Sequence, residues 1–276
     1  ELLSAFSAAE GRELLRAHPD VAVLLLDVVM EEENAGLKLV RYIREELKNS
    51  MVRIILRTGH PGQAPEESVT MEYDINDYRE KADLTARSLK TALITAFRSY
   101  RDIATINTLN SEIESTQKEL IYALGEIAES RSLETGHHVK RVGEIAGLLA
   151  KKYGLSEAET ARMPLAASMH DLGKLAIHDS ILNKPGPLTA EEFAIMKQHS
   201  RFGYEILSKS SRPLLQMAKV IALEHHENYD GTGYPRGLVG QEISPWSRIV
   251  ALADVVDALG TRRIYKDAWS KEEIFD

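Results

Sequence analysis

Between residues 84 and 130 the chain contains no proline and a single glycine, Gly125. Mostly small or apolar residues recur there at alternating spacings of four and three: Ala92, Ala96, Ser99, Ile103, Ile106, Asn110, Ile113, Gln117, Leu120, Leu124 and Ile127. A repeat of about 3.5 residues forms the seam of a coiled coil, in which polar residues such as Asn110 and Gln117 fix register and oligomeric state. The spacing predicts one long helix. It favours a parallel homodimer over a helix that packs only on its own domain.

The regions on either side of this helix differ in pattern. The N-terminal region alternates continuous apolar runs with helical spacing, the runs being 21–27 and 52–59 and the helical segments 7–18 and 35–47. This alternation predicts a parallel sheet with helices on both faces. The C-terminal region has helical spacing almost throughout, which predicts an all-α domain. The three predicted parts are an α/β domain at 1–83, a coiled-coil helix at 84–122 and an all-α domain at 123–276.

Helix start signals recur in the C-terminal part. A Ser or Thr followed three residues later by Glu forms a capping box, and this pattern occurs at Ser156–Glu159, Thr189–Glu192 and Ser270–Glu273. Ser244-Pro245 places an N-cap residue before a proline at the first helical position.

Composition excludes several classes of protein. The net charge of −8 argues against binding to duplex nucleic acid, which needs a basic surface. The absence of cysteine excludes disulfides and thiolate metal sites, and it suits a reducing cytoplasm. The longest apolar run, 21–30, contains Asp27 and is shorter than the roughly 20 residues that a membrane span takes. We therefore expect a cytoplasmic protein without a membrane anchor.

Histidines and carboxylates are concentrated in the C-terminal part, where seven of the nine histidines lie between 137 and 226. A buried imidazole or carboxylate is costly unless it is paired or bound to metal, and such residues occur on successive predicted helices. The candidate ligands are Glu134, His138, His170, Asp171, His199, His225, His226 and Asp254. Nitrogen and oxygen ligands without sulfur suit iron, manganese or zinc. The number of candidates exceeds the needs of one ion, which predicts two or three ions with Asp171 as a bridging carboxylate.

A site of this kind favours phosphoryl chemistry. Two adjacent metal ions lower the pKa of a bound water and clamp the oxygens of a phosphate. Lys174 follows His170 by one helical turn and is placed to neutralise a non-bridging phosphate oxygen. Without the neighbouring His-Asp pair, the same lysine would be interpreted as an ordinary surface residue.

Four separated motifs carry a resemblance to a known family. "ETGHHVKRV" at 134–142, "HDLGK" at 170–174, "HHENYDGTGYP" at 225–235 and "ALADVVDAL" at 251–259 resemble the HD-GYP family of cyclic di-GMP phosphodiesterases. The resemblance covers 123–276 and implies that the eight residues above are metal ligands, that Asp171 and Lys174 are catalytic and that Lys174 faces the phosphate. It also implies that Tyr234 stacks on a guanine base and that Arg263 and Lys266 contact the ligand.

Two departures from the family pattern affect the pocket. Ile177-His178 stands where an Ile-Pro pair is usual, so His178 is a candidate polar group at the pocket rim. Arg263-Ile264-Tyr265-Lys266 lacks the family's proline, which affects how this loop is placed. The closing helices of the family are expected to be largely missing.

The N-terminal part resembles the receiver domain of a response regulator. Asp27 ends a buried strand, as a phosphoacceptor does, Thr58 ends the next strand, and Lys81 takes the place of the receiver lysine. The resemblance implies a histidine kinase as a partner. The usual Met-Pro turn and a proline after Lys81 are absent, and the first strand with its acidic pair is expected to be missing. Alternatively, Asp27 is a strand-end residue that is never phosphorylated.

These features predict a metal-dependent phosphodiesterase that converts cyclic di-GMP to pGpG and onward to GMP, regulated by the receiver-like part. One alternative is 3',3'-cyclic GMP-AMP as the substrate. A second alternative is a non-catalytic sensor of cyclic dinucleotides, which the complete set of candidate ligands argues against.

Overall fold

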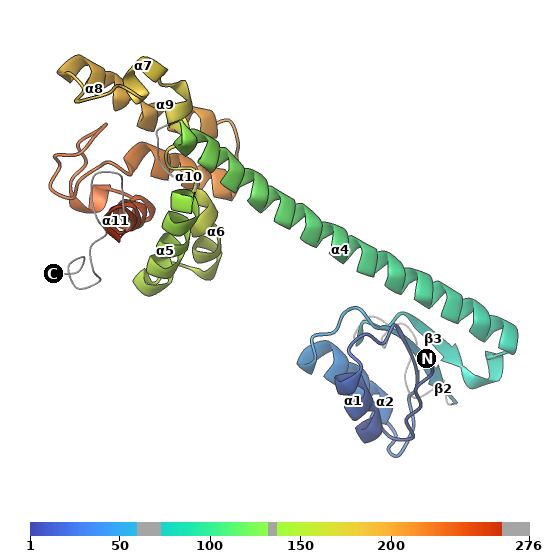
Figure 1. Cartoon of the computed structure of the whole chain (residues 1–276). Helices are drawn as coiled ribbons and strands as arrows, with labels where there is room; N and C mark the ends of the chain where they lie inside the picture. Colours follow the sequence, from blue (N-terminus) through green and yellow to red (C-terminus); the bar gives the residue numbers. More distant parts are fainter. Residues whose placement is uncertain (60–72, 132–136, 261–276) are drawn as a thin grey trace. The chain divides into compact units, whose positions relative to one another are not determined.

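A computed structural model describes residues 1–59, 73–131 and 137–260 (Figure 1). The chain divides into two units, Glu1–Ile113 and Glu114–Asp276. One helix of 45 residues, α4 (Ala86–Ser130), contributes to both of them. The long helix expected from the sequence is therefore present.

The first unit is an α/β structure. Its elements are α1 (Ala8–Ala17), β1 (Val23–Asp27), α2 (Ala35–Arg41), the π-helical turn η1 (Tyr42–Glu46), β2 (Arg53–Thr58), β3 (Asp77–Glu80), the 3-10 turn η2 (Lys81–Asp83) and the first part of α4. The strands are parallel in the order β1-β2-β3, and Asp27 pairs in register with Arg57. The predicted strands correspond to β1 and β2, whereas the polar edge strand β3 was not predicted.

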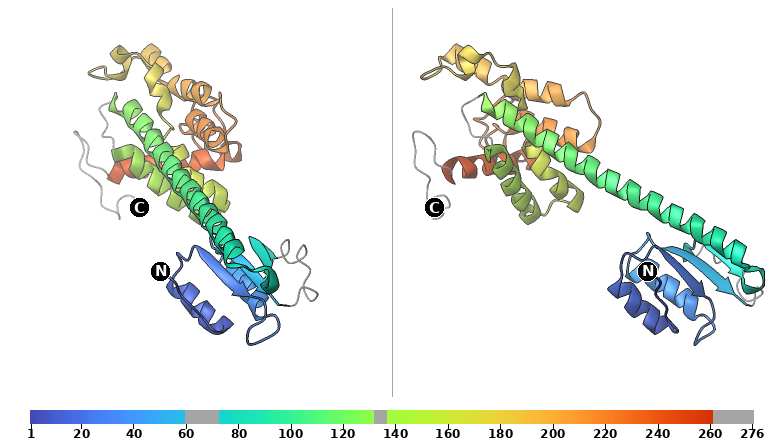
Figure 2. Two further views of the ribbon diagram at one scale, coloured as in Figure 1. Left: turned by 90° about the vertical axis from the view of Figure 1, so that its right-hand side faces the viewer. Right: turned by 45° about the vertical axis from the view of Figure 1, so that its right-hand side comes forward.

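Helices cover both faces of this sheet, as the sequence predicts. Ile54 and Leu56 of β2 point into a core formed with α1 and α2, whereas Ile55 points to the other face and packs against Ala92 and Ala96 of α4. The first turns of α4 and the pair α1 and α2 accordingly lie on opposite faces of the sheet (Figure 2).

The packing of α4 corrects one part of the predicted coiled-coil seam. Ala92 and Ala96 are buried against the chain's own sheet, so the prediction that the seam begins at residue 92 is wrong. The apolar seam residues from Ile106 to Ile127 remain exposed.

The second unit consists of helices and short helical turns in its described residues. Besides the end of α4, its elements are α5 (His137–Tyr153), α6 (Glu157–Ala167), η3 (Leu172–Ala176), α7 (Asp179–Leu182), α8 (Ala190–Met196), α9 (His199–Leu207), α10 (Pro213–Glu224), η4 (Gly240–Glu242) and α11 (Pro245–Gly260). The core is rich in alanine, which lets the helices approach closely. This core packs α10 against α6 and α9.

The predicted helix starts are confirmed where they are described. Ser156 with Glu159 and Thr189 with Glu192 form complete capping boxes, and α11 begins at Pro245. The pair Ser270–Glu273 lies outside the described residues.

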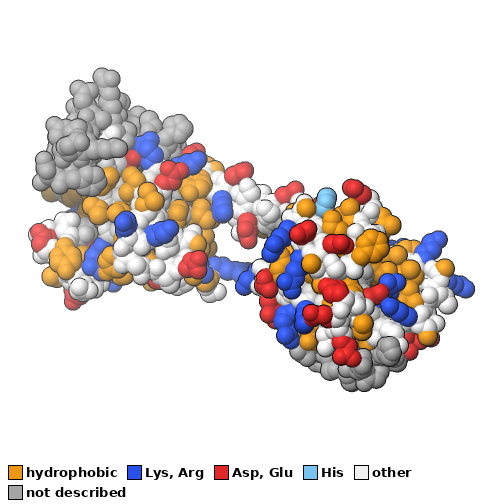
Figure 3. Space-filling view, turned by 90° about the horizontal axis from the view of Figure 1, so that it is seen from below, with side chains coloured by type: hydrophobic (Ala, Val, Ile, Leu, Met, Phe, Trp, Pro, Cys, Tyr) orange, Lys and Arg blue, Asp and Glu red, His pale blue; other side chains and the backbone are white. Residues whose placement is uncertain are grey.

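The charged groups do not gather into one basic surface on the visible face. Figure 3 shows Lys and Arg side chains interspersed with Asp and Glu side chains there. Among the described helices, none is both long enough and apolar enough to cross a bilayer.

Candidate metal centre and active site

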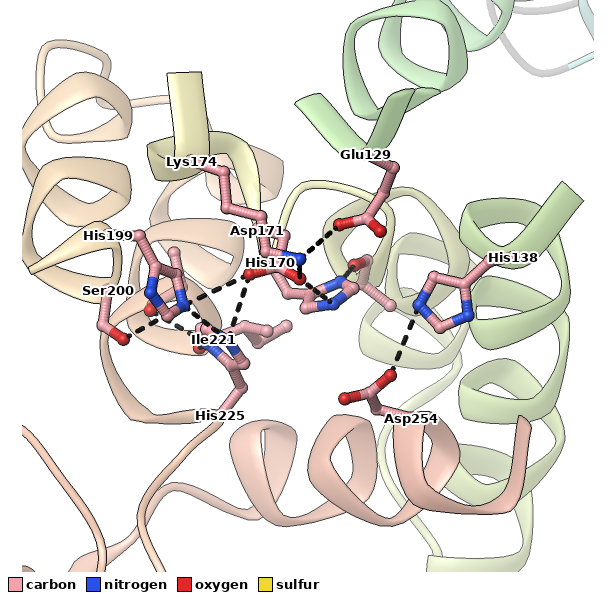
Figure 4. A network of polar contacts seen from close by, with 12 residues as sticks. Glu129, His138, His170, Asp171, Lys174, His199, Ser200, Ile221, His225 and Asp254 are labelled. Carbon is pink, nitrogen blue, oxygen red and sulfur yellow. Dashed lines mark hydrogen bonds and ion pairs between the residues drawn. The ribbon is translucent and has the colours of Figure 1, made fainter. Parts of the chain in front are cut away.

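Three of the site histidines lie close to the end of a helix. His170 and His199 follow the last residues of α6 and α8 by three positions, His199 being also the first residue of α9, and His225 caps α10. The last carbonyl groups of a helix have no intrahelical partner, and Nδ1–H of each of these histidines donates to one of them. The Nδ1–O distance is 2.8 Å for His170 and His199 and 3.0 Å for His225, in each case to the carbonyl three residues earlier. These bonds fix the tautomer and leave Nε2 directed into the site (Figure 4).

A fourth histidine, His138 on α5, is held by a carboxylate. Its Nδ1 lies 2.7 Å from Oδ2 of Asp257 on α11, and Arg141 Nε lies 2.5 Å from Oδ1 of the same carboxylate. His138 Nε2 then faces Asp254, 3.3 Å from its Oδ1. A carboxylate that orients a histidine in this way is typical of metal sites.

Asp171 lies at the middle of the site. Its Oδ1 is 3.2 Å from His199 Nε2, and its Oδ2 is 3.1 Å from His170 Nε2. Gly173 makes this placement possible, because a Cβ there would lie 1.9 Å from the backbone oxygen of His199. The two oxygens of Asp171 therefore face different histidines, as a bridging carboxylate requires.

The ligand atoms group into three overlapping clusters. They are Asp171, His199, His225 and His226; His138, His170 and Asp254; and Glu129, His170 and Asp171. Within the described residues, the buried atoms His170 Nε2 and Asp171 Oδ1 make the ion-pair contacts given above, but no neighbour meets them in hydrogen-bond geometry. Buried polar atoms are normally satisfied, so these two atoms fit metal coordination. Bound divalent ions would supply a Lewis acid for a phosphate and an acidified water.

Seven of the eight expected ligands lie in these clusters, and the eighth, Glu134, lies outside the described residues. Glu129 is a further candidate that sequence reasoning missed. It is buried on α4, and its Oε1 is 3.0 Å from Lys174 Nζ. Gly125, one turn earlier on α4, could have indicated in the sequence which face of this helix is packed closely, because it is the single glycine between residues 84 and 130. A Cβ at this position would lie 2.4 Å from the backbone oxygen of Ser168. The face of α4 that carries Gly125 and Glu129 is therefore the face that packs against the site.

Lys174 is positioned inside the site rather than on the surface. Its Nζ lies 2.8 Å from Asp171 Oδ2 as well as 3.0 Å from Glu129 Oε1 (Figure 4). Burial lowers the pKa of Lys174, but attraction by Asp171 and Glu129 outweighs it and raises the pKa above the usual value. The shift favours the ammonium form of the side chain.

The electrostatics keep two of the candidate ligands, Asp171 and His226, in the forms that bind metal. Burial opposes ionisation of Asp171, but Lys174 and His170 hold the pKa of its carboxyl well below the usual value. Burial, reinforced by the neighbouring His225, lowers the pKa of His226 to about 2. A carboxylate and a neutral imidazole are the forms that bind metal. Burial opposes a charge on His138 and His170, but neighbouring carboxylates raise the pKa of His138 to about 10 and that of His170 to about 9, so these two imidazoles would release a proton on binding a metal ion.

The remaining expected residues fall into three groups. Tyr234 lies beside the centre, its ring centroid 4.7 Å from that of His226. His178 caps α7 through Nδ1, which accepts a hydrogen bond from the backbone N–H of Ser180. Arg263 and Lys266 lie outside the described residues.

In the first unit, the structure brings together the receiver-like residues. Asp27, at the end of β1, forms ion pairs with Lys81 at 3.1 Å and with Arg57 at 2.6 Å. Thr58 ends the neighbouring strand β2 and is buried. Arg57 is an addition that the sequence did not suggest, and it follows from the parallel register that places it beside Asp27.

A helical unit that gathers five histidines and three carboxylates in adjoining clusters defines a metal-dependent phosphohydrolase of the His-Asp type. The family model for the HD domain matches residues 123–276. Together with the Gly233-Tyr234-Pro235 motif and the relatives reported next, this match shows that the chain belongs to the HD-GYP members of the HD-domain family.

Three relatives illustrate the similarity. The 3'3'-cGAMP-specific phosphodiesterase 2 of Vibrio cholerae is 34% identical, and the alignment covers 99% of this chain and 81% of the relative. The cyclic di-GMP phosphodiesterase response regulator RpfG of Xanthomonas campestris is 39% identical over 91% of this chain and 69% of the relative. A cyclic di-GMP phosphodiesterase of Thermotoga maritima is 47% identical over 60% of this chain and 45% of the relative.

Proposed function

We propose that the chain hydrolyses cyclic di-GMP to linear pGpG, and onward to GMP, at the centre formed by α4, α5, η3, α9, α10 and α11. The observation that carries the proposal is the position of Asp171, whose two oxygens face two histidines while Lys174 lies 2.8 Å away. Asp171 holds the adjoining clusters together, and the Lys174 ammonium neutralises a non-bridging oxygen of the phosphodiester. The nitrogen and oxygen donor set favours two or three iron or manganese ions.

Two alternative functions differ from this one, the first in its substrate and the second in having no catalytic step. 3',3'-cyclic GMP-AMP is a second candidate substrate, because a relative with that named specificity aligns with nearly the whole chain. A sensor that binds a dinucleotide without cleaving it is disfavoured by the seven clustered ligands and the buried Lys174.

The test is product analysis. Protein reconstituted with iron or manganese is incubated with each dinucleotide, and the products are separated by chromatography. We expect pGpG from cyclic di-GMP, at least two metal ions per chain, and loss of nearly all turnover in Asp171→Ala. Glu157→Gln, an exposed change on α6, is the matched control. Binding without any cleavage would support the sensor, and one ion or fewer per chain would contradict a multinuclear centre.

Regulation by the first unit is a further part of the proposal. The Asp27 cluster with Thr58 and Lys81 supports a receiver-like domain in which Asp27 is the phosphoacceptor for a histidine kinase. The cysteine-free composition supports a cytoplasmic location for this signalling.

Assembly as a parallel homodimer through α4 completes the proposal. Its support is an apolar stripe at coiled-coil spacing in which Ile106, Ile113, Leu120, Leu124 and Ile127 are each 47–59% exposed. A second copy of the same helix would cover this stripe, and Asn110 and Gln117 would set its register.

A further inference from the structure

An aromatic and cationic group of side chains lies beside the metal centre. It consists of Phe193, Lys197 and Tyr234, which we call the rim cluster. Phe193 lies on α8, and Lys197 caps the same helix one turn later. Lys197 Nζ is 5.2 Å from the centroid of the Phe193 ring and 5.7 Å from that of Tyr234. The two rings meet edge to face, with centroids 6.3 Å apart.

Tyr234 connects the rim cluster to the candidate metal ligand His226. The Tyr234 ring is tilted by 31° from that of His226 at a centroid distance of 4.7 Å, so one of its faces is largely covered. Phe193 is different, because it is 46% exposed even though Lys197 Nζ lies over one face of its ring. Phe193, rather than Tyr234, is therefore the ring available to a ligand that reaches the metal centre.

The chemistry of the rim cluster fits a nucleobase. An exposed aromatic ring stacks on any base. A lysine ammonium carries three donors and no acceptor, so it selects a base edge that offers acceptors. Guanine presents O6 and N7, both acceptors, whereas adenine presents the acceptor N7 beside the N6 donor group. An ammonium beside the stacked base consequently favours guanine.

Building on the proposed phosphodiesterase function, we propose that the rim cluster is a guanine subsite: Phe193 stacks on one base of the cyclic dinucleotide, and Lys197 donates to its O6 and N7. The subsite accepts cyclic di-GMP and also 3',3'-cyclic GMP-AMP, each of which contains a guanine. It discriminates against cyclic di-AMP, which contains none.

The test compares the three dinucleotides on the full chain loaded with manganese. Values of kcat and KM are measured for each, and binding of slowly cleaved phosphorothioate analogues is followed by calorimetry. For Phe193→Ala we expect KM for cyclic di-GMP to rise about ten-fold, the loss of one stacked base. For Lys197→Met we expect the preference for cyclic di-GMP over cyclic di-AMP to fall about ten-fold. Phe193→Trp and Lys197→Arg should restore both properties, because Trp also stacks and Arg also donates to O6 and N7.

The controls separate this inference from the proposed function. Ile195→Ala changes another exposed residue of α8 and should leave all kinetic values unchanged. If Lys197→Met weakens the three dinucleotides equally, Lys197 contacts phosphate and the guanine subsite is wrong. If Phe193→Ala leaves KM and analogue binding unchanged, the stacking role is wrong. If the unaltered protein cleaves none of the dinucleotides but cleaves bis(p-nitrophenyl) phosphate, the proposed function itself fails.

Discussion

At the scale of single residues, the candidate metal centre depends on what holds Nδ1 of each histidine. Backbone carbonyls at helix ends hold His170, His199 and His225, whereas His138 depends on the carboxylate of Asp257. A helix-end carbonyl cannot be removed by a side-chain substitution. His138 is therefore the ligand whose orientation is easiest to disturb without touching the ligand itself.

We expect Asp257→Asn to weaken metal binding about 10- to 100-fold, the usual cost of losing a partner that orients a ligand. The neutral amide no longer strengthens the basicity of His138, and it leaves Arg141 without its ionic partner. Competition titration with a coloured chelator measures the affinity. Glu144→Gln, an exposed change on the same helix as His138, is the control. Equal affinities for Asp257→Asn and the unaltered protein would show that Asp257 has no part in metal binding.

The sequence indicated the clustered candidate ligands better than the residues that support them. The candidate ligands are His and Asp residues at unusual positions on apolar helices, a pattern visible along the chain. Glu129 and Asp257 were missed because a carboxylate on a helix is ordinarily a solvated residue, and only the packing of α4 and α11 shows that both are buried. The same reason explains Arg57, whose partner Asp27 is set by the register of two strands.

At the scale of secondary-structure elements, the end of α4 is tied directly to the turn that carries Lys174. Arg131 follows the last residue of α4, and its Nη1 donates to the carbonyl of Leu175 at 2.7 Å. Its Nη2 donates to the carbonyl of Ile177 at 3.1 Å. With Glu129 bound to Lys174, α4 contacts η3 on two sides. A movement of α4 would therefore move Lys174.

We expect Arg131→Gln to lower kcat about ten-fold, on the order of 1.4 kcal/mol in activation free energy, with the metal content unchanged. Arg131→Lys should not restore the rate, because an ammonium cannot reproduce the forked hydrogen bonds of a guanidinium. Steady-state kinetics and elemental analysis measure the two quantities. Arg201→Gln, which alters an exposed ion pair on α9, serves as the comparison. A normal kcat in Arg131→Gln would show that η3 keeps its position without α4.

The bounds of helices and strands could be predicted where a strand is apolar throughout or a helix begins with a capping box. The apolar runs of β1 and β2 and the capping boxes of α6 and α8 could be predicted because each is a local signal. The strand β3 has the polar sequence Asp-Tyr-Arg-Glu and lies at the sheet edge, so local pattern did not indicate it. The start of the coiled-coil seam was wrong because alanine suits both a seam and a helix–sheet contact, and only tertiary packing distinguishes them.

The exposed stripe of α4 leads to a prediction about assembly. A glutamate at Leu120 would place like charges opposite each other in a parallel dimer, and we expect Leu120→Glu to raise the dimer dissociation constant at least about ten-fold. Light scattering across a concentration series measures it. Lys118→Glu, an exposed change off the seam, should leave the dimer intact. A monomer for the unaltered protein at micromolar concentration would contradict the homodimer.

At the scale of the whole molecule, α4 is the element that both units share. Its early turns pack on the sheet that carries Asp27, and its last turn carries Glu129 beside Lys174. A ligand or modification at one site can change activity at another only by favouring one of two states. A small rotation of α4 is an event of this kind, because it would alter both contacts together.

We expect charge at Asp27 to change the catalytic rate through α4. Asp27→Asn breaks the ion pairs with Arg57 and Lys81, and it should alter kcat at least about five-fold, the lower range of measured couplings. Arg57→Met, which removes one ion pair and keeps the aspartate, is the companion variant. Inserting one residue after Gln117 turns the rest of the helix by about 100°, and it should abolish the response to Asp27→Asn. Inserting seven residues keeps the seam in phase and should preserve the response. If kcat is the same with and without Asp27→Asn in the parent chain, the first unit serves for assembly and does not regulate the metal centre.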